Sequence, residues 1–255
     1  MAGGRGTRLS PLTHAVSKQL LPVFNKPMIW YPLSTLMLAG IREINVICSP
    51  EYSRIFKNLL GDGSDFGISL NYVSQNFPDG IAQGIQLSEE FLEGQPFALI
   101  LGDNLFWGRG LGNSLESNLQ RDGATIFGYE VANPSHYGVG VFSHDGKLVE
   151  IEEKPEKPQS NVAITGLYFY DSRAIDYLKS IKPSKRNELE ISDLNRLYLR
   201  DNLLHLSMLP RGTAWIDTGD FESLLEAANF VRIIENRTGL RIGDPYEVAR
   251  NKNWI

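Results

Sequence analysis

Between residues 32 and 103 the sequence alternates between helix-like segments and short apolar segments of strand length. The helix-like segments are 33–39, 51–60 and 82–92, and the strand-like segments are 43–49, 68–73 and 97–101. Gly40 follows the first helix-like segment, where a glycine commonly ends a helix. Alternation at this pace is typical of βα units, which build a parallel sheet with helices on both faces. We therefore predict an α/β fold with a mostly parallel central sheet flanked by helices.

After Asp103 the pattern shifts toward strands. Segments 124–131, 139–142 and 147–153 are of strand type, and Asp145 and Gly146 between the last two predict a tight hairpin turn. Apolar residues recur at helical spacing from 221 to 237 and predict a long amphipathic helix. The proline-containing loops 154–158 and 182–186 are too short to link independent domains. We expect a single domain over 1–255, with a smaller mixed-strand subdomain in its second part.

The composition argues against several classes of partner. The net charge of −5 argues against the clustered lysines and arginines that a nucleic-acid-binding face needs. The longest apolar stretches are far short of the roughly 20 residues of a membrane span, so neither nucleic acid nor a membrane is expected as a partner. The start at Met1 has no secretory signal pattern, and the lone Cys48 cannot form an internal disulfide. We predict a cytoplasmic location. The four histidines lack zinc-like spacing.

The first ten residues contain a candidate phosphate-binding loop. Residues 3–8, GGRGTR, place three glycines in four positions, which lets backbone N–H groups approach an anion closely while basic side chains neutralise its charge. The segment is not a Walker A loop, and Leu9 breaks the dinucleotide pattern G-x-G-x-x-G. A plain turn is the alternative. Because Lys18 adds another cation within ten residues, a polyanion site is the better interpretation.

The motif at 3–9 (GG-x-GTRL), followed by 18–22 (KQLLP), resembles the signature of the sugar-nucleotide pyrophosphorylases. The resemblance is closer to the bacterial glucose-1-phosphate thymidylyltransferases and covers essentially the whole chain. It continues through 26–29 (KPMI), 60–64 (LGDGS), 78–83 (PDGIAQ), 101–104 (LGDN), 152–155 (EEKP), 165–170 (TGLYFY) and 215–219 (WIDTG). It implies the Rossmann-like nucleotide-diphospho-sugar transferase fold, with a nucleotide-binding half at 1–103. The half at 104–255 would bind the sugar and supply the second metal ligand.

The resemblance implies dTTP and glucose 1-phosphate as substrates. A phosphate oxygen of the sugar would attack the α-phosphorus in line, giving dTDP-glucose and pyrophosphate. Such catalysis consists mainly of positioning and charge neutralisation. A phosphate monoester has a second pKa near 6, so the attacking oxygen is largely ionised at neutral pH and no general base is required. Cations and metal ligands are therefore expected in the site, and the sequence has no G-x-S-x-G nucleophile motif.

Two carboxylates are candidates for a Mg²⁺ site. Asp103 follows the strand-like segment 97–101, and ligands commonly meet parallel sheets at such strand ends. Asp217 follows the apolar stretch 213–216, and the resemblance makes it the second metal ligand. One or two carboxylates together with substrate phosphates suit Mg²⁺. The alternatives are a turn-forming Asp103 and an Asp217 that caps the helix at 221–237.

The resemblance also implies roles for other residues. Lys18 would contact the transferring phosphates, and Arg8 would grip the β- and γ-phosphates, so the catalytic set is Arg8, Lys18 and Asp103. The nucleotide-binding set is Gly3, Gly4, Gly6, Thr7, Arg8, Gln19, Gln75 and Gly80. Glutamine amides can pair with the imide edge of a pyrimidine. The sugar-binding set is Gly138, Glu153, Lys154 and Thr165, with Glu153 accepting from hydroxyls and Lys154 meeting the sugar phosphate.

Three features depart from the family pattern. Only Met1 and Ala2 precede Gly3, where the family has a central apolar strand, so a truncated or misplaced start is expected. Val162 stands where many close relatives have tyrosine, which leaves the hexose open. The chain stops at Ile255, while several relatives continue into a helical segment with oligomer contacts and a regulatory site, which leaves feedback inhibition open. A homotetramer or homodimer is implied by the resemblance alone.

Three other functions were weighed against this interpretation. A sister enzyme of the same fold would use UTP and differ only in its base and sugar contacts. A nucleotide-sugar glycosyltransferase is disfavoured, because the strand ends in DNL rather than in the D-x-D metal motif. A catalytically silent nucleotide-binding paralogue is disfavoured, because Arg8, Lys18, Asp103 and Asp217 are all present.

Overall fold

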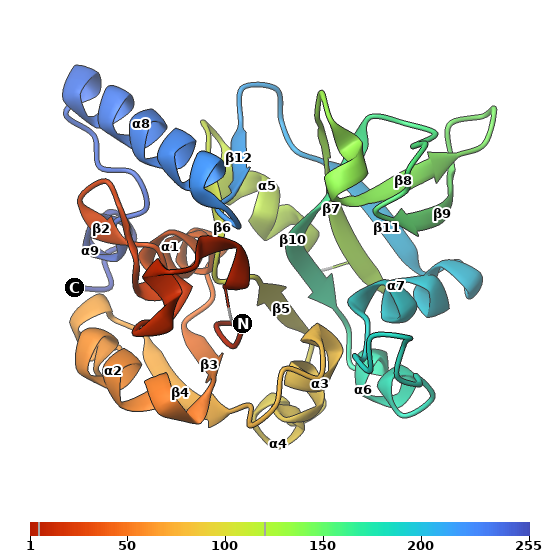
Figure 1. Cartoon of the computed structure of the whole chain (residues 1–255), viewed down its shortest axis with the longest axis horizontal. Helices are drawn as coiled ribbons and strands as arrows, with labels where there is room; N and C mark the ends of the chain where they lie inside the picture. Colours follow the sequence, from red (N-terminus) through yellow and green to blue (C-terminus); the bar gives the residue numbers. More distant parts are fainter. Residues whose placement is uncertain (5, 120) are drawn as a thin grey trace. The chain divides into compact units, whose positions relative to one another are not determined.

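The computed structural model describes residues 1–4, 6–119 and 121–255, which form two compact units (Figure 1). The first unit comprises Met1–Pro78, Ile100–Glu116 and Gly212–Ile255, and the second comprises Asp79–Leu99 and Ser117–Arg211. These units differ from the halves 1–103 and 104–255 expected from the sequence. The reason is that the last part of the chain returns to the first unit, which therefore holds both Asp103 and Asp217.

The predicted helices and strands between residues 30 and 74 are confirmed in the first unit. They are α1 (Trp30–Leu38), β3 (Glu43–Cys48), α2 (Pro50–Leu60) and β4 (Ser69–Ser74). Strands β3 and β4 are parallel, with Glu43 opposite Ser69 and Cys48 opposite Ser74, and α2 lies beside them (Figure 1). Helix α1 begins three residues before its predicted start, because Pro32 falls in its first turn, where a missing N–H group is tolerated.

The first two residues lie beside β3. The backbone N–H of Ala2 donates to the carbonyl of Ile47 at 2.6 Å. On the other side, the amino group of Met1 donates to the carbonyl of Ile100 at 2.9 Å, and Gly102 donates to the carbonyl of Met1 at 2.8 Å. The entry into the glycine-rich loop is therefore held by backbone hydrogen bonds to β3 and to residues 100–102.

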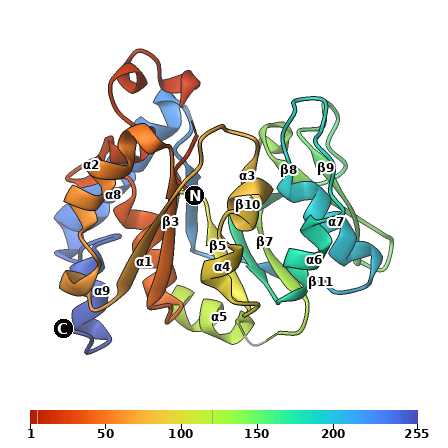
Figure 2. The ribbon, with the colours of Figure 1, turned by 90° about the horizontal axis from the view of Figure 1, so that it is seen from below.

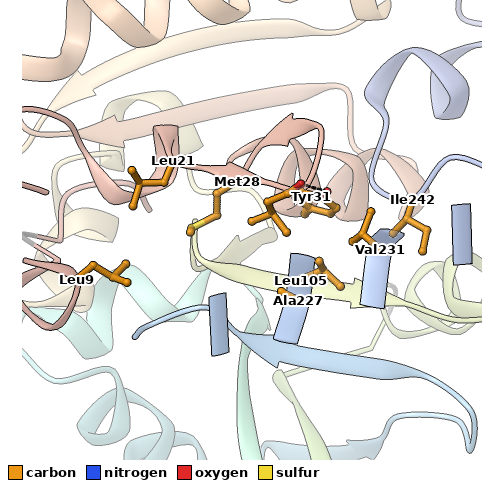
Figure 3. Packing of buried hydrophobic residues seen from close by; sticks show 9 residues of the cluster. Leu9, Leu21, Met28, Tyr31, Leu105, Ala227, Val231 and Ile242 are labelled. Atoms are coloured by element: carbon orange, nitrogen blue, oxygen red, sulfur yellow. Dashed lines mark hydrogen bonds between the residues drawn. The ribbon is translucent and has the colours of Figure 1, made fainter. Parts of the chain in front are cut away.

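The rest of the first unit surrounds a buried apolar cluster. Its elements are β1 (Pro22–Val23), β2 (Lys26–Pro27), η4 (Ser64–Phe66), β6 (Asn104–Trp107), α5 (Leu111–Asn118), β12 (Ala214–Asp217), α8 (Phe221–Thr238) and α9 (Pro245–Asn251). The cluster consists of Leu9, Leu21, Val23, Met28, Tyr31, Leu105, Ala227, Val231 and Ile242 (Figure 3). The hydroxyl of Tyr31 donates to the carbonyl of Val23 at 2.8 Å, which satisfies a buried polar group. The cluster joins the N-terminal loops to β6 and α8.

The second unit contains a mixed sheet in the strand order β11-β7-β10-β8-β9, with β5 also pairing with β10. Its strands are β5 (Phe97–Ile100), β7 (Ala124–Glu130), β8 (Gly138–Phe142), β9 (Leu148–Glu153), β10 (Val162–Tyr170) and β11 (Leu204–Met208). Strand β11 is parallel to β7, whereas β10 is antiparallel to β7 and β8. Helices α6 (Arg173–Leu178) and α7 (Ile191–Arg200) lie beside this sheet (Figure 2). The α/β class is confirmed, and so is the predicted hairpin between β8 and β9.

One predicted helix is wrong in its extent. The segment 82–92 forms two short helices, α3 (Ile81–Gln86) and α4 (Glu89–Leu92). At the break, the hydroxyl of Ser88 donates to the carbonyl of Gly84 at 3.0 Å, while the backbone N–H of Ser88 donates to the carbonyl of Ile85. A serine side chain that takes a backbone acceptor competes with the helical hydrogen bond, and the helix is interrupted there.

Within residues 1–4, 6–119 and 121–255, every helix is too short or too polar to span a lipid bilayer.

Replacing Lys26 by methionine is expected to destabilise the fold strongly. The ammonium group of Lys26 lies 2.5 Å from Oε1 of Glu235, and the two side chains are only 5% and 10% exposed. Burial would raise the pKa of Glu235, but hydrogen bonds from Lys26 and the N–H of Ile242 hold it below its ordinary value. Removing one partner of a buried ion pair costs about 3 to 5 kcal/mol, because the other charge stays buried.

Urea unfolding at pH 7 measures this loss of stability. The control is the double variant Lys26→Met/Glu235→Leu, which removes both charges and should recover part of the free energy of unfolding. The recovery is incomplete because the N–H of Ile242 loses its acceptor, which lies 2.8 Å away in the native protein. An unchanged unfolding midpoint in Lys26→Met alone would contradict the assigned role of the pair.

Candidate active site

The glycine-rich loop is packed against Lys18. Gly6 has a φ of +60° and precedes the short helix η1 (Thr7–Leu9), so its left-handed backbone favours glycine. A Cβ on Gly6 would lie 3.1 Å from Cβ of Lys18, and one on Gly4 would lie 3.7 Å from its Cε. The structure therefore brings the loop glycines and the lysine together. Arg5, which belongs to the same motif, lies outside the described residues.

The segment after the loop holds Lys18 and Gln19 in the short helix η3 (Lys18–Leu20), which follows η2 (Leu12–His14). The backbone N–H of Ile29 donates to the carbonyl of Gln19 at 2.8 Å. The hydroxyl of Ser17 donates to the amide oxygen of Gln19 at 2.5 Å, and both side chains are buried. The bond from Ile29 holds the backbone of Gln19, and the bond from Ser17 orients its amide, with the amide oxygen as the acceptor.

Asp103 and Asp217 are brought together by the antiparallel pair β6 and β12. Asp217, the last residue of β12, pairs with Asn104, the first residue of β6. The backbone N–H of Thr218 donates to the carbonyl of Asp103 at 2.9 Å. The ammonium group of Lys18 is hydrogen-bonded to Oδ2 of Asp103, and both side chains are nearly buried. One cationic and two anionic groups thus share a small region of the first unit.

The two carboxylates have opposite pKa shifts. Burial would raise the pKa of Asp103, but the ammonium group of Lys18 and a hydrogen bond from Asn104 hold it below its ordinary value. Burial, and next the negative charge of Asp103, raise the pKa of Asp217 to about 6. One ammonium group leaves the two buried carboxylates with a net negative charge, which a divalent cation would neutralise.

The alternative role of Asp217 as a helix cap is wrong, because Asp220 caps α8. A carboxylate oxygen of Asp220 accepts a hydrogen bond from the N–H of Ser223 at 2.9 Å, and the hydroxyl of Ser223 accepts from the N–H of Asp220. This reciprocal pair satisfies the first turn of the helix. Asp217 is therefore not required for capping.

Arg8 lies against the turn that follows Asp217. A Cβ on Gly219 would collide with Nη2 of Arg8, so the glycine leaves room for the guanidinium group. Arg8 is also 3.9 Å from Asp220, and its side chain is 61% exposed. An exposed ion pair at this distance contributes little to stability. The guanidinium group is thus held near the carboxylate pair and stays accessible to an anion.

The other two residues predicted to contact the base lie in different units. In the first unit Gln75 is buried, and a Cβ on Gly3 would lie 2.7 Å from its amide oxygen, so the side chain of Gln75 lies against the loop backbone. Gly80 belongs to the second unit, precedes α3 and has a φ of +105°, a conformation that favours glycine.

The four predicted sugar-binding residues converge within the second unit. Gly138 on β8 pairs with Glu153 on β9 and with Ile164 on β10. Thr165 is the next residue on β10 after Ile164, so it lies close to this pair. Lys154 follows Glu153 and has a φ of +46°, which is uncommon for a residue with a side chain. The buried hydroxyl of Thr165 has no hydrogen-bond partner among the residues that the structure describes. The short helix η5 (Pro134–His136) precedes β8.

A nucleotidyl transferase family model matches residues 1–233 of this chain. The chain belongs to the nucleotidyl transferase family. Its relatives include the glucose-1-phosphate thymidylyltransferase of Xanthomonas campestris pv. campestris, which is 54% identical over all of this chain and 87% of its own length. The protein of the same name from Neisseria meningitidis is also 54% identical, over all of this chain and 89% of its own. The Mycobacterium tuberculosis protein of that name is 50% identical, with 100% and 88% covered.

Solved structures of nucleotidyl transferases resemble the fold as well. A Bacillus anthracis protein described as a glucose-1-phosphate thymidylyltransferase, crystallised with sucrose, has a TM-score of 0.85 at 36% identity, with 96% of both chains covered. A UDP-glucose pyrophosphorylase bound to UDP-glucose has a TM-score of 0.77 at 26% identity, covering 91% of this chain and 96% of that one.

Sequence reasoning missed several polar residues that support the predicted nucleotidyl transferase site. Thr218 donates its hydroxyl to the carbonyl of Asp103 at 2.6 Å, and Asn104 donates its amide to Oδ1 of Asp103 at 3.1 Å. In the second unit, Ser192 donates to Oε2 of Glu153 at 3.2 Å. Asn104 and Thr218 directly follow the two aspartates, which was a usable signal. Ser192 lies far from Glu153 in the sequence and gave none.

The carboxylate pair fits Mg²⁺ only if the substrate completes the site. Among the described residues, no group of three or more acidic, histidine or cysteine side chains is placed to hold a metal. Asp103 and Asp217 carry hard carboxylate oxygens, and the register of β12 on β6, with the hydrogen bond from Thr218 to the carbonyl of Asp103, brings the two residues close together. Mg²⁺ is commonly held by one or two carboxylates together with substrate phosphates and water. The donor set of this nucleotidyl transferase agrees with that pattern.

In the absence of divalent cations, Asp217 is expected to make the folded protein less stable as the pH rises from about 4 to about 6. The pKa of this carboxyl rises from 3.8 to about 6 on folding, so in this window the folded state binds more protons than the unfolded state. Stability present at low pH is therefore lost as the pH passes through the folded pKa. Asp217→Asn should remove this loss, which is on the order of 2 kcal/mol.

Urea unfolding of the wild type and of Asp217→Asn at pH 4.5 and pH 7 measures the effect of this carboxyl. The matched control is Asp145→Asn, because hydrogen bonds from Ser143 and Lys147 lower the pKa of Asp145, so its contribution has the opposite sign. An identical pH dependence in the wild type and in Asp217→Asn would contradict the assigned shift.

Proposed function

We propose that this nucleotidyl transferase transfers a thymidylyl group from dTTP to glucose 1-phosphate, giving dTDP-glucose and pyrophosphate. The main support for this proposal is the 54% identity over the whole chain with proteins named glucose-1-phosphate thymidylyltransferase. The geometry around Asp103 supports the proposal. Lys18, Asp103 and Asp217 are gathered beside the glycine-rich loop, as charge neutralisation at a polyphosphate would require.

The chemistry requires positioning more than proton transfer. The attacking oxygen of a phosphate monoester is largely ionised above a pKa near 6, so no residue has to remove a proton. Asp103 and Asp217 would hold Mg²⁺, which when bound neutralises charge on the triphosphate. Lys18 would turn from Asp103 toward the transferring phosphate, and the exposed guanidinium group of Arg8 would hold the departing pyrophosphate. The N–H groups of the loop at Gly3, Gly4, Gly6 and Thr7 would bind phosphate oxygens.

The substrate groups away from the reacting phosphorus would be held by other residues. The amides of Gln19 and Gln75 are proposed to bind the base, and in the second unit the backbone at Gly80 is proposed to contact the nucleotide. In the second unit Glu153 is proposed to accept from sugar hydroxyls and Lys154 to meet the sugar phosphate. Within the described part of the chain the buried hydroxyl of Thr165 has no hydrogen-bond partner, which supports a polar ligand there, because such groups normally have one.

The test mixes the purified chain with Mg²⁺ and glucose 1-phosphate and offers dTTP, UTP, ATP, CTP and GTP separately. Pyrophosphate release is followed in each case. A strong preference for dTTP supports the proposal. Release only when glucose 1-phosphate is present excludes simple hydrolysis of the nucleotide. No release with any nucleotide would favour a silent nucleotide-binding paralogue.

A uridylyltransferase is the second candidate function. It is favoured by one observation, the TM-score of 0.77 to a UDP-glucose pyrophosphorylase, although the identity of 26% is about half that of the thymidylyltransferases. A higher kcat/KM with UTP than with dTTP in the same assay would establish it.

The homodimeric or homotetrameric state and the cytoplasmic location remain proposals. Helix α8 carries large apolar side chains that are about half exposed, namely Phe221, Leu225 and Ile233, and contact with another copy would cover them. Light scattering of the purified chain would measure the oligomeric state. The single cysteine, Cys48, is buried and unpaired, as is common in a reducing compartment.

A further inference from the structure

A chain of hydrogen bonds connects Trp215 to Asp103. The indole N–H of Trp215, on β12, donates to the amide oxygen of Asn104 at 2.7 Å. The amide nitrogen of Asn104 donates to Oδ1 of Asp103 at 3.1 Å. Trp215 is 7% exposed and Asn104 only 2%. The connection is therefore shielded from water over its whole length.

The hydrogen-bonding chemistry of these groups fixes which atom donates and which accepts in each bond. An indole N–H can only donate, so it holds the oxygen of the Asn104 amide toward Trp215. The amide nitrogen must then point the other way, toward the carboxylate of Asp103. If the amide turned over, its NH₂ group would face the indole N–H, and two donors would meet in a buried place.

Asp103 is held at three points. Oδ1 accepts from Asn104, and Oδ2 accepts from Lys18. Its backbone carbonyl accepts from both the N–H and the hydroxyl of Thr218, at 2.9 and 2.6 Å. When Lys18 moves to a phosphate, the hydrogen bond from Asn104 still orients the carboxylate. The rotamer of Asp103 then depends on the group that fixes Asn104.

We propose that Trp215, acting through Asn104, is a positioning residue that orients the carboxylate of Asp103 toward a divalent cation. The inference rests on the proposed metal-binding role of Asp103 and extends it to Trp215, which is connected to that carboxylate through Asn104. Hydrogen-bond partners behind a metal ligand typically change metal affinity or activity by 10- to 100-fold, so we expect an effect of about that size.

The test compares Trp215→Phe with Trp107→Phe in the full chain. Both tryptophans lie on the β6–β12 pair, on neighbouring strands, and Trp107 packs edge-on against Phe230. Trp215→Phe keeps an aromatic ring but loses the N–H donor. The readouts are Mn²⁺ binding to the protein saturated with dTTP in the absence of glucose 1-phosphate, followed by electron paramagnetic resonance, and the Mg²⁺ dependence of pyrophosphate release. Urea unfolding reports any loss of folded protein.

We expect Trp215→Phe to weaken Mn²⁺ binding and to raise the required Mg²⁺ concentration by about 10- to 100-fold, with Trp107→Phe close to the wild type in both. A purely structural role would lower the unfolding midpoint of Trp215→Phe without changing its metal affinity, and that outcome overturns the proposal. If both variants lose metal affinity equally, ring packing is responsible, and the proposal is also wrong.

A double variant tests whether Trp215 acts through Asn104. Asn104→Leu should weaken Mn²⁺ binding, and Trp215→Phe/Asn104→Leu should be no weaker than Asn104→Leu alone, because the shared connection is already broken. Additive losses would overturn the inference. Asp103→Asn distinguishes a failure of the proposed metal site from a failure of the positioning role of Trp215. If it binds Mn²⁺ like the wild type, the metal site itself is wrong and the proposed function loses that support. If Asp103→Asn loses Mn²⁺ affinity but Trp215→Phe binds Mn²⁺ like the wild type, only the positioning inference is wrong.

Discussion

Asp103→Asn is expected to lower kcat for pyrophosphate release by about 10³-fold or more, since it removes a proposed metal ligand and the charged partner of Lys18 at once. An asparagine offers one neutral oxygen where the carboxylate offers two charged ones. The fold should persist, because the carbonyl of Asp103 still accepts from Thr218, and the backbone pairing of β6 with β12 is unchanged.

The measurement is pyrophosphate release at saturating substrates over a range of Mg²⁺ concentrations, with circular dichroism as a check on folding. Asp145→Asn is the matched control, because Asp145 lies in the β8–β9 hairpin turn, where Asn before Gly is also favourable. Turnover at the wild-type level in Asp103→Asn with Mg²⁺ would contradict the assignment of Asp103 as a metal ligand.

Lys18→Gln is expected to lower kcat by about 10²- to 10³-fold, which corresponds to about 2.7 to 4 kcal/mol of transition-state stabilisation. Lys18 is the cation packed between the glycine-rich loop and Asp103, so its loss leaves the loop without its nearest buried positive charge. The pKa of Asp103 should rise as well, because the charge of Lys18 and its hydrogen bond lower that pKa in the native protein.

The kinetics of this lysine variant separate catalysis from binding. A role in the transition state lowers kcat, whereas a role in ground-state binding alone would raise KM for dTTP and leave kcat unchanged. Lys147→Gln is the control, since Lys147 is 81% exposed in the β8–β9 hairpin. Carbon-13 NMR of the Asp103 carboxyl would follow its pKa. An unchanged kcat in Lys18→Gln would contradict the catalytic role.

Much of the fold could be predicted because its signals are local. The strands β3, β7, β8 and β9 and the long helix α8 appear within one or two residues of their predicted bounds. Periodicity of apolar residues and a turn glycine are enough to produce such elements. Other elements were not predicted, namely strands β1, β2, β6, β10, β11 and β12 and helices α5, α6, α7 and α9. Most of them are short segments with little periodicity, and pairing or packing with distant parts of the chain stabilises them.

The candidate site was predictable to the level of motifs. The glycine-rich loop, Lys18, Asp103 and Asp217 were singled out from the sequence, and the structure gathers them in the first unit. The alternative use of Asp217 as a helix cap could not be settled from the sequence, because Asp220 is also a good capping residue at the start of the same helix. Only the hydrogen bonds of Ser223 assign the cap to Asp220.

Local periodicity and motifs in a fixed order are enough to give the α/β class, about half of the helices and strands, and the family. Tertiary structure alone decided which polar atoms meet. The register of β6 on β12 places Asp217 opposite Asn104 and lets the indole of Trp215 reach the amide behind Asp103. The burial of Lys26 against Glu235 likewise joins parts of the chain that are 209 residues apart. No local pattern encodes such contacts, because they depend on how distant segments pack around a common core.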